Sequence, residues 1–213
     1  MLWDDFQTNT GRIIHKWEHY FPAYEEMFSS FRNKTITFLE IGCGSGGSLQ
    51  MWRRYFGPLS VIVGIDINPS CIEFEGHGIH VRIGDQSDPM FLAQVVEEFG
   101  VPDVVLDDGS HIMKHVNASF DFFYPKMSMN SIYMVEDLHT AYWEDFGGGI
   151  HSEVSFINRT KQMIDLLNAH HSRGAVPITE FNKTTYSMHI YDSIVAFRKG
   201  RARKYQPMIG TAD

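Results

Sequence analysis

The sequence predicts an α/β fold: a doubly wound, mostly parallel sheet that ends in an antiparallel hairpin. Short, uninterrupted apolar stretches alternate with stretches of helical periodicity, which is typical of a parallel sheet with helices on both faces. Glycine or acidic residues follow almost every apolar stretch, and ligands bind at this carboxyl edge in doubly wound sheets. At about 150 residues per domain, a length of 213 residues predicts one domain.

The first 34 residues are predicted to be a helical segment of the same domain as residues 35–213. Apolar side chains recur there at helical spacing, at Ile13, Ile14, Trp17 and Phe21. We therefore expect helix from residue 4 to 32, kinked or broken at Pro22, with a second short helix over 25–31.

The remaining elements are predicted to alternate along the chain. Strands are expected at residues 35–41, 61–66, 79–83, 104–106 and 131–135. Helices are expected at residues 48–56, 87–99, 113–124 and 155–171. Residues 186–190 and 194–198 are predicted to form the hairpin, and the glycine- and aromatic-rich residues 139–151 a long loop over the site.

Composition excludes several classes of protein. Hydrophobic residues make up 43% and charged residues 21%, an ordinary globular balance that excludes disorder. Two cysteines exclude a disulfide framework and favour a reducing compartment. The acidic N-terminus does not resemble a signal peptide, and no apolar stretch approaches the ~20 residues of a membrane span. We therefore expect a cytoplasmic protein without a membrane partner.

The charge balance argues against a nucleic-acid partner. There are 26 acidic and 18 basic residues, which gives a formal net charge of −8. Five of the basic residues lie within the short stretch 198–204. An acidic body with one basic run is not typical of nucleic-acid binding, so we expect this run to be a solvated tail.

A glycine cluster lies between the first predicted strand and the helix that follows. Gly42, Gly44 and Gly47 match the spacing G-x-G-x-x-G in the strand–helix context that a nucleotide loop requires. No Gly-Lys-Ser/Thr follows, which excludes a P-loop. A dinucleotide and S-adenosylmethionine both fit, since each has a ribose that an acid at Asp66 would hold.

Glu40 favours S-adenosylmethionine over a dinucleotide. It lies two residues before the first glycine, as in the E/D-x-G-x-G motif of class I methyltransferases. Asp85 and Gln86, after the third predicted strand, would then lie at the adenine. The sequence thus predicts a nucleoside site along the ends of three neighbouring strands.

Four carboxylates end two neighbouring strands of the predicted sheet, at Asp107, Asp108, Glu136 and Asp137. Like charges this close repel unless a proton or a cation neutralises them. Oxygen ligands suit Mg²⁺ or Mn²⁺ rather than zinc. Adjacent strand residues point to opposite sides, so we expect Asp107 and Asp108 to diverge. The residues alone leave open which of the four bind a metal.

Histidines accompany the acids. His111 lies three residues beyond Asp108, where a neutral imidazole beside a metal-held hydroxyl would be a general base. His115 completes His-x-x-x-His, but the glutamate that would follow the first histidine of a zinc protease is missing. His139 closely follows Asp137 and is expected to face the site.

Seven short segments occur in a familiar order, at residues 20–24, 39–42, 64–69, 84–86, 107–111, 135–138 and 140–143. In this order they resemble the metal-dependent O-methyltransferases that modify sugars of macrolides and related glycosylated natural products, the mycinamicin and demethylmacrocin type. The likeness covers nearly the whole chain. It implies a Rossmann-like, seven-stranded methyltransferase sheet. Members of this type can carry an extra N-terminal domain, whereas 34 residues precede the first predicted strand here.

The resemblance also implies roles for individual residues. Mg²⁺ would be held by Asp108, Glu136 and Asp137, with His111 as the base. Glu40, Gly42, Asp66 and Asp85 match cofactor positions. Gly44, Ser48, Gln86 and Asp107 are also predicted to belong to the cofactor site. The acceptor would be a sugar hydroxyl whose neighbouring hydroxyl also reaches the metal.

The expected reaction is a single methyl transfer to a glycoside. His139, Tyr142 and Trp143 are predicted to contact this acceptor, since aromatic faces suit the C–H surfaces of sugars. Three alternatives stay open: a catechol-like phenolic acceptor, a nicotinamide-dependent oxidoreductase, and a non-catalytic S-adenosylmethionine-binding protein. The sugar, the position methylated and assembly as a homo-oligomer also stay open.

Overall fold

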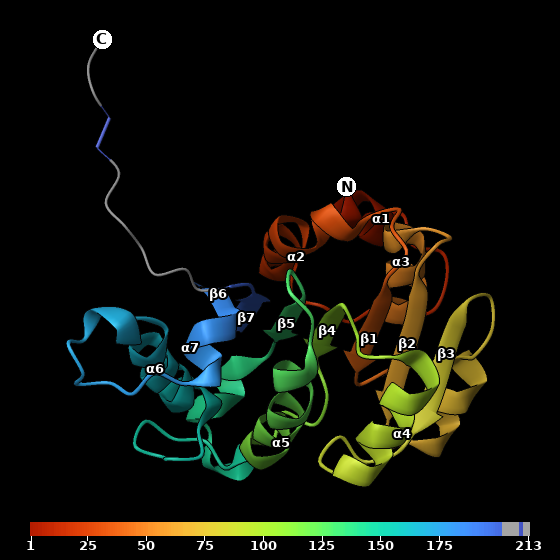
Figure 1. The fold of residues 1–213 in the computed structure, drawn as a ribbon. Helices are drawn as coiled ribbons and strands as arrows, with labels where there is room; N and C mark the ends of the chain where they lie inside the picture. The colour runs from red at the N-terminus through yellow and green to blue at the C-terminus, as the bar shows by residue number, and fades with distance from the viewer. Residues whose placement is uncertain (202–208, 211–213) are drawn as a thin grey trace.

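The computed structural model describes residues 1–201, 209 and 210, and within them one sheet has seven strands in the order β3-β2-β1-β4-β5-β7-β6 (Figure 1). The strands are β1 (Thr37–Ile41), β2 (Val61–Asp66), β3 (Ile79–Ile83), β4 (Val104–Asp107), β5 (Ile132–Val135), β6 (Thr185–Tyr191) and β7 (Ile194–Lys199). The first five are parallel, and β7 is antiparallel to both of its neighbours, β5 and β6. The predicted fold class and its hairpin are confirmed.

Helices cover both faces of the sheet (Figure 1). On one face lie α1 (Leu2–Gln7), α2 (Phe21–Phe28) and α3 (Gly47–Phe56), and on the other α4 (Pro89–Phe99), α5 (Met113–Phe123) and α6 (Phe156–Leu167). Each face of the sheet has its own hydrophobic core, and successive strand residues alternate between the two. Phe38 packs in the core that includes α1, α2 and α3, and Leu39 packs in the core that includes α4, α5 and α6. This double burial explains why the strands read as continuous apolar stretches.

Shorter helices complete the chain. One is α-helical, α7 (Glu180–Thr184), and the others are 3-10 turns: η1 (Glu18–Tyr20), η2 (Ser29–Phe31), η3 (Pro69–Phe74), η4 (Tyr124–Lys126), η5 (Leu138–Tyr142), η6 (Glu144–Phe146) and η7 (Ala169–His171). Two of them interrupt the predicted loop 139–151, since η5 overlaps its start and η6 lies inside it. The helix expected over 155–171 ends at Leu167, and η7 follows it.

The prediction of helix over residues 4–32 is wrong for residues 8–17, whereas α1 and the run from η1 to η2 are helical and include most of the expected second helix over 25–31. The chain leaves α1 at Gln7 and crosses the carboxyl edge of the sheet as residues 8–17, which we call the strap, without regular structure. The side chains at helical spacing do not all face a core, since Ile13 is 74% exposed. Polar contacts hold this segment in a non-helical conformation instead. For example, the backbone N–H of Arg12 donates to Gln50 Oε1 on α3 at 3.0 Å. Pro22 stands in the first turn of α2, where proline is tolerated.

The basic run is only partly the solvated tail that was expected. Arg198 and Lys199 belong to β7, and Lys199 is 3% exposed, with its ammonium donating to Thr184 Oγ1 at 3.0 Å. Residues 202–204 lie outside the described part of the chain. Among the described helices, none has the length and apolar character needed to cross a membrane.

Candidate active site

The glycine loop between β1 and α3 uses its glycines in two ways. Gly42 has a φ of +90°, and a Cβ there would overlap the carbonyl of Asp108. Gly44 has a φ of +49°, and no described atom lies within 4 Å of the place of its Cβ, so its backbone is open to a ligand. A Cβ on Gly47 would overlap the carbonyl of Ile13. The third glycine of the fingerprint therefore makes room for the strap.

Asp66, at the end of β2, is held by two backbone amides. Its Oδ2 accepts from the N–H of Cys43 at 2.7 Å, and its Oδ1 accepts from the N–H of Asn68 at 2.8 Å. The side chain lines both cavities at this edge of the sheet. It therefore stands, already oriented, where the sequence predicts the ribose contact.

The first of these hollows, which we call the apolar cavity, has a volume of about 330 Å³. Its wall includes Ile41, Ile65, Ile67, Asp85, Gln86 and Ile112. Gln86 is fixed at both ends, since its Oε1 accepts from the N–H of Ser110 at 2.7 Å and its Nε2 donates to Asp107 Oδ1 at 3.1 Å. His115 lies in this wall too, hydrogen-bonded to Ser110 Oγ at 3.1 Å. A flat apolar ring with a polar edge fits such a cavity.

Asp107 lies beneath the apolar cavity rather than in its wall. Its carboxylate accepts from Ser119 Oγ at 2.5 Å and from Tyr133 Oη at 3.0 Å, in addition to Gln86. Burial raises the pKa of Asp107, although these hydrogen bonds to the carboxylate oppose the shift. Asp107 thus fixes the side-chain amide of Gln86. It would act on a ligand of the apolar cavity only through that amide.

Glu40 is equally buried and lines neither cavity. Its Oε2 accepts from Ser48 Oγ at 2.7 Å, and its Oε1 accepts from Trp52 Nε1 at 3.2 Å. Burial raises the pKa of Glu40. Ser48 does line the second cavity, so the carboxylate of Glu40 orients a hydroxyl that a ligand can reach.

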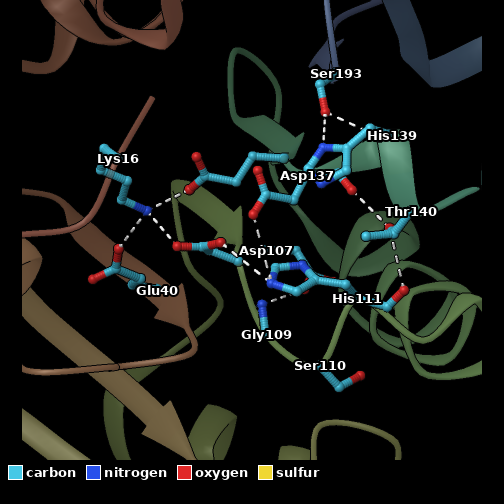
Figure 2. Close-up of polar contacts among 12 residues, drawn as sticks. Lys16, Glu40, Asp107, Gly109, Ser110, His111, Asp137, His139, Thr140 and Ser193 are labelled. Atoms are coloured by element: carbon cyan, nitrogen blue, oxygen red, sulfur yellow. Dashed lines mark hydrogen bonds and ion pairs between the residues drawn. The ribbon is translucent and has the colours of Figure 1, made fainter. Parts of the chain in front are cut away.

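The second hollow, which we call the acidic cavity, has a volume of about 300 Å³ and brings together Asp108, His111, Glu136 and Asp137. His111 Nε2 lies 3.8 Å from Asp108 Oδ1 and 3.7 Å from Asp137 Oδ2. Asp108 points away from the partners of Asp107, which confirms that the two adjacent acids diverge. Figure 2 shows Asp137 and His111 converging from two different loops.

His111 and Asp137 share a left-handed backbone, each with a φ of +57°. Non-glycine residues in this conformation cost energy and persist where the surroundings hold them, often at functional sites. Thr140 is one such support: its Oγ1 donates to the carbonyl of Asp137 at 2.7 Å and lies 3.4 Å from the carbonyl of His111 (Figure 2). Sequence reasoning missed Thr140, because its role depends on two backbone carbonyls from separate loops.

Lys16 was also missed, because the strap was expected to be helical. Its ammonium reaches Glu136 Oε1 at 2.5 Å and Asp108 Oδ2 at 2.6 Å. It also lies 3.3 Å from Glu40 Oε1 (Figure 2). Burial disfavours the charged ammonium, but the neighbouring carboxylates outweigh burial and raise the pKa of Lys16 well above its ordinary value. A buried, charged lysine therefore faces the acidic cavity.

Two tyrosines from the N-terminal region hold the acids from the other side. Tyr20 Oη donates to Asp137 Oδ1 at 2.6 Å, and Tyr24 Oη donates to Glu136 Oε2. Both lie in the segment 20–24 that contributed to the family resemblance, but spacing alone assigned them no partner.

None of the predicted acceptor residues lines the acidic cavity, but His139 packs against Trp17, which does, and against Trp143. His139 Nδ1 pairs with Ser193 Oγ at 2.8 Å, and its ring centre lies 5.9 Å from Trp17 and 4.9 Å from Trp143. Trp17 and Trp143 are each about half exposed. Tyr142 is exposed as well, but neither cavity wall includes it. Trp17, which the sequence placed in a helix, thus joins the aromatic surface predicted from His139 and Trp143.

The donor set of the acidic cavity fits a divalent cation. Ligand atoms of Asp108, His111 and Asp137 lie within 4.8 Å of one another. Oxygens of Asp108 and Glu136 lie equally close to one of Glu40, which itself lines neither cavity. Mostly oxygen donors fit Mg²⁺ or Mn²⁺. The open backbone at Gly44 and the fixed carboxylate of Asp66 fit a nucleoside whose base lies in the apolar cavity.

Comparison by sequence finds relatives that modify sugars of natural products, while no protein-family model matches the chain. The chain is 36% identical over 195 residues to 8-demethyl-8-alpha-L-rhamnosyl tetracenomycin-C 2'-O-methyltransferase of Streptomyces olivaceus, which covers 86% of this chain and 50% of that protein. It is 34% identical over 213 residues to demethylmacrocin O-methyltransferase of Streptomyces fradiae, with 92% and 53% covered. The chain thus spans about half the length of the relatives it matches.

Comparison by structure agrees. The MycE methyltransferase of the mycinamycin biosynthetic pathway, solved in complex with Mg, SAH and mycinamycin VI, superposes with a TM-score of 0.80 at 31% identity, over 94% of this chain and 53% of that one. A putative caffeoyl-CoA O-methyltransferase from Staphylococcus aureus, with a TM-score of 0.56 at 14% identity, shares the fold alone.

The chain has the fold of the class I methyltransferases, which use S-adenosylmethionine. Within this class, the chain is related in sequence and in fold to the sugar O-methyltransferases of antibiotic pathways. The resemblance inferred from its motifs is confirmed.

Proposed function

We propose that the chain transfers a methyl group from S-adenosylmethionine to a sugar hydroxyl of a glycosylated small molecule, with Mg²⁺, or Mn²⁺ in its place, as the metal. The observation that carries the proposal is that the apolar and acidic cavities share Gly42, Asp66 and Gly109. A methyl donor in the first and a metal-held hydroxyl in the second would meet at this common wall. The names of the relatives support a sugar as the acceptor.

The residues of the apolar cavity would bind the nucleoside of the donor. Asp66 would accept hydrogen bonds from the ribose hydroxyls, and Asp85 and Gln86 would contact the adenine edge. Gly42, Gly44 and Ser48 would border the methionine end, since all three also line the acidic cavity. Glu40 and Asp107 would act from beneath, through Ser48 and Gln86.

Asp108 and Asp137 would hold the metal, with Glu136 as the third carboxylate. When bound, Mg²⁺ supplies the charge that lowers the pKa of an acceptor hydroxyl. His111 Nε2, which faces both aspartates, would accept the hydroxyl proton as general base. The oxygen bonds to the methyl carbon while the carbon–sulfur bond breaks, which leaves a methyl ether and S-adenosylhomocysteine.

His139, Tyr142 and Trp143 would contact the acceptor outside the metal, together with Trp17. The ring of His139 packs against those of Trp17 and Trp143, Trp17 lines the acidic cavity, and Tyr142 is half exposed. Aromatic faces pack against sugar C–H groups or an apolar aglycone. One part of the acceptor would then bind at the metal and another part on this aromatic surface.

Calorimetric titration with S-adenosylhomocysteine, with NAD in parallel, tests the proposal before any acceptor is known. Micromolar binding of S-adenosylhomocysteine alone is expected. Binding of NAD, or of neither, would overturn the methyltransferase assignment. Turnover with a sugar diol in competition with a catechol then decides the acceptor class, and preference for the catechol would replace the sugar with a phenol.

The wider expectations remain predictions. We propose that residues 1–34 and 35–213 act as one domain, that the protein is cytoplasmic, and that it takes no nucleic-acid partner. Assembly as a homo-oligomer is open to measurement by light scattering. A monomer that methylates a glycoside would show that one chain holds the complete site.

A further inference from the structure

A third hollow, which we call the rear cavity, lies among α5, α6, α7 and the end of β7 and has a volume of about 390 Å³. Figure 1 shows α6 and α7 beside β6 and β7. None of the residues in its wall lines the apolar or the acidic cavity. Lys199, in this wall, donates its backbone N–H to the carbonyl of Ser131 at 2.9 Å, next to the start of β5, whereas Glu136 follows the end of β5. The rear cavity is therefore separate from the proposed active site.

The wall of the rear cavity is apolar except for a few charged side chains. Asp121 in this wall is ion-paired with Arg159, and Glu180 is ion-paired with Lys183 at 2.7 Å. Among the described residues, no carboxylate forms such a pair with the ammonium of Lys199. The wall thus contains one cation whose charge is not neutralised by a direct partner. Its apolar part is formed by Phe120, Tyr124, Pro125, Met163, Leu166 and Phe181.

Lys199 is buried with incomplete hydrogen bonding. It is 3% exposed, and lysine is rarely buried to this extent without an acidic partner. Its ammonium donates to Thr184 Oγ1 at 3.0 Å and lies 4.7 Å from the centre of the Tyr124 ring. An ammonium has three protons to donate, and the described part of the chain offers no further acceptor. A ligand in the rear cavity that brought an acceptor oxygen to this ammonium would complete its hydrogen bonding.

The chemistry of the wall selects one kind of ligand. A cavity of this volume is within the range of small-molecule sites, roughly 300–1,000 Å³. Aromatic and aliphatic side chains favour an apolar body, while the ammonium favours an anionic oxygen. A charge-assisted hydrogen bond to a carboxylate is about twice as strong as one between neutral groups. A cationic ligand would instead be repelled by Lys199.

We propose that the rear cavity binds a small apolar carboxylate, whose body packs against Phe120, Tyr124 and Phe181 and whose carboxylate accepts a hydrogen bond from the ammonium of Lys199. Charge complementarity and the apolar wall carry this inference. It does not rest on the proposed function, because the rear cavity shares no lining residue with the two cavities at the other edge of the sheet.

The test compares three probes on the full chain by amide NMR titration. Phenylacetate is expected to bind with a Kd of about 1 mM or tighter and to shift the signals of residues 120–124 and 180–184. Phenylacetamide has the same shape without the charge and is expected to bind at least about tenfold more weakly, since the charge-assisted hydrogen bond is lost. Acetate, which lacks the apolar body, is expected not to bind.

Two substitutions locate the site. Lys199→Met is expected to bind phenylacetate and phenylacetamide equally, whereas Lys34→Met, at an exposed lysine, should keep the preference of wild type. Leu166→Trp leaves Lys199 in place but enlarges a side chain in the wall, so it should abolish binding of both compounds. It also keeps the inference testable if Lys199→Met does not fold, as judged by near-ultraviolet circular dichroism.

Three results would overturn the inference. Equal binding of phenylacetate and phenylacetamide by wild type would mean that the charge of Lys199 plays no part. Absence of phenylacetate binding would mean that Thr184 and Tyr124 are enough for the ammonium. Binding that persists in Leu166→Trp, with shifted signals around Asp66 and Gln86, would place the ligand in the apolar cavity instead. None of these results changes the outcome of the titration with S-adenosylhomocysteine that tests the proposed function.

Discussion

The apolar cavity and the acidic cavity lie at the same edge of the sheet but differ in the number of charged side chains in their walls. In the apolar cavity, the wall includes four isoleucines, and the carboxylate of Asp85 accepts hydrogen bonds from the N–H and the hydroxyl of Ser87. In the acidic cavity, carboxylates face a lysine, a histidine and each other. The first is suited to recognise a ring by shape, and the second to hold a cation and move a proton.

The sheet itself produces this division. Asp107 and Asp108 are adjacent in sequence, yet Asp107 points to Ser119 on α5 while Asp108 points to Lys16 in the strap. The alternation of side chains at the end of β4 thus sends one acid to support the apolar cavity and the other into the acidic one. Substitutions in either cavity should therefore change different measurable quantities.

Asp137→Asn is expected to have the largest effect, since it removes the charge of a proposed metal ligand in the acidic cavity. The amide keeps the size of the side chain but removes its charge, so Mn²⁺ affinity should fall at least tenfold and turnover by about 10³-fold or more. Metal titration and initial rates at saturating methyl donor measure both. The matched control is Asp145→Asn, at an exposed acid nearby. Unchanged metal affinity would remove Asp137 from the ligand set.

His111→Ala comes next and separates proton transfer from binding. Loss of a general base is expected to lower kcat by about 10² to 10⁴-fold. Affinity for S-adenosylhomocysteine should stay within twofold, because His111 lies outside the wall of the apolar cavity. The exposed His170→Ala is the control. Turnover at the wild-type rate would show that another group takes the proton.

Gln86→Ala is expected to act on the apolar cavity alone. Truncation leaves the N–H of Ser110 without its side-chain acceptor, at a cost of about 1–3 kcal/mol for a buried polar group, and Asp107 keeps its bonds to Ser119 and Tyr133 but loses that to Gln86. Affinity for S-adenosylhomocysteine should fall about tenfold, while Mn²⁺ affinity stays unchanged. Calorimetry measures both ligands on one sample. An equal loss of metal binding would mean that the two cavities are coupled through Asp107 and Asp108.

The two cavities also differ in how far the sequence predicts them. Asp66 ends β2, and Asp85 and Gln86 follow closely after β3. Because the carboxyl ends of parallel strands meet at one edge of the sheet, the sequence predicts their common position without knowledge of tertiary contacts. Lys16 and Trp17 reach the acidic cavity from a strap whose apolar spacing resembles a helix. Their positions depend on partners that lie far away in sequence, as Glu136 does from Lys16. Periodicity reports local conformation, so it could not find a segment that is held by charge.

Ser87→Ala is expected to have the smallest effect. It tests whether neutral hydrogen-bond donors stabilise the carboxylate of Asp85 in the apolar cavity. The N–H and the hydroxyl of Ser87 lower the pKa of Asp85, and the variant loses the hydroxyl. An acid with a lowered pKa in the folded state stabilises the protein above its unfolded-state pKa, and this contribution is lost as the pH falls through the folded-state value. The variant should therefore be less stable than wild type by about 0.5 kcal/mol at pH 7, and the difference should vanish near pH 2. Urea unfolding at the two pH values measures it. An equal difference at both pH values would mean that the serine hydroxyl acts on packing rather than on the carboxylate.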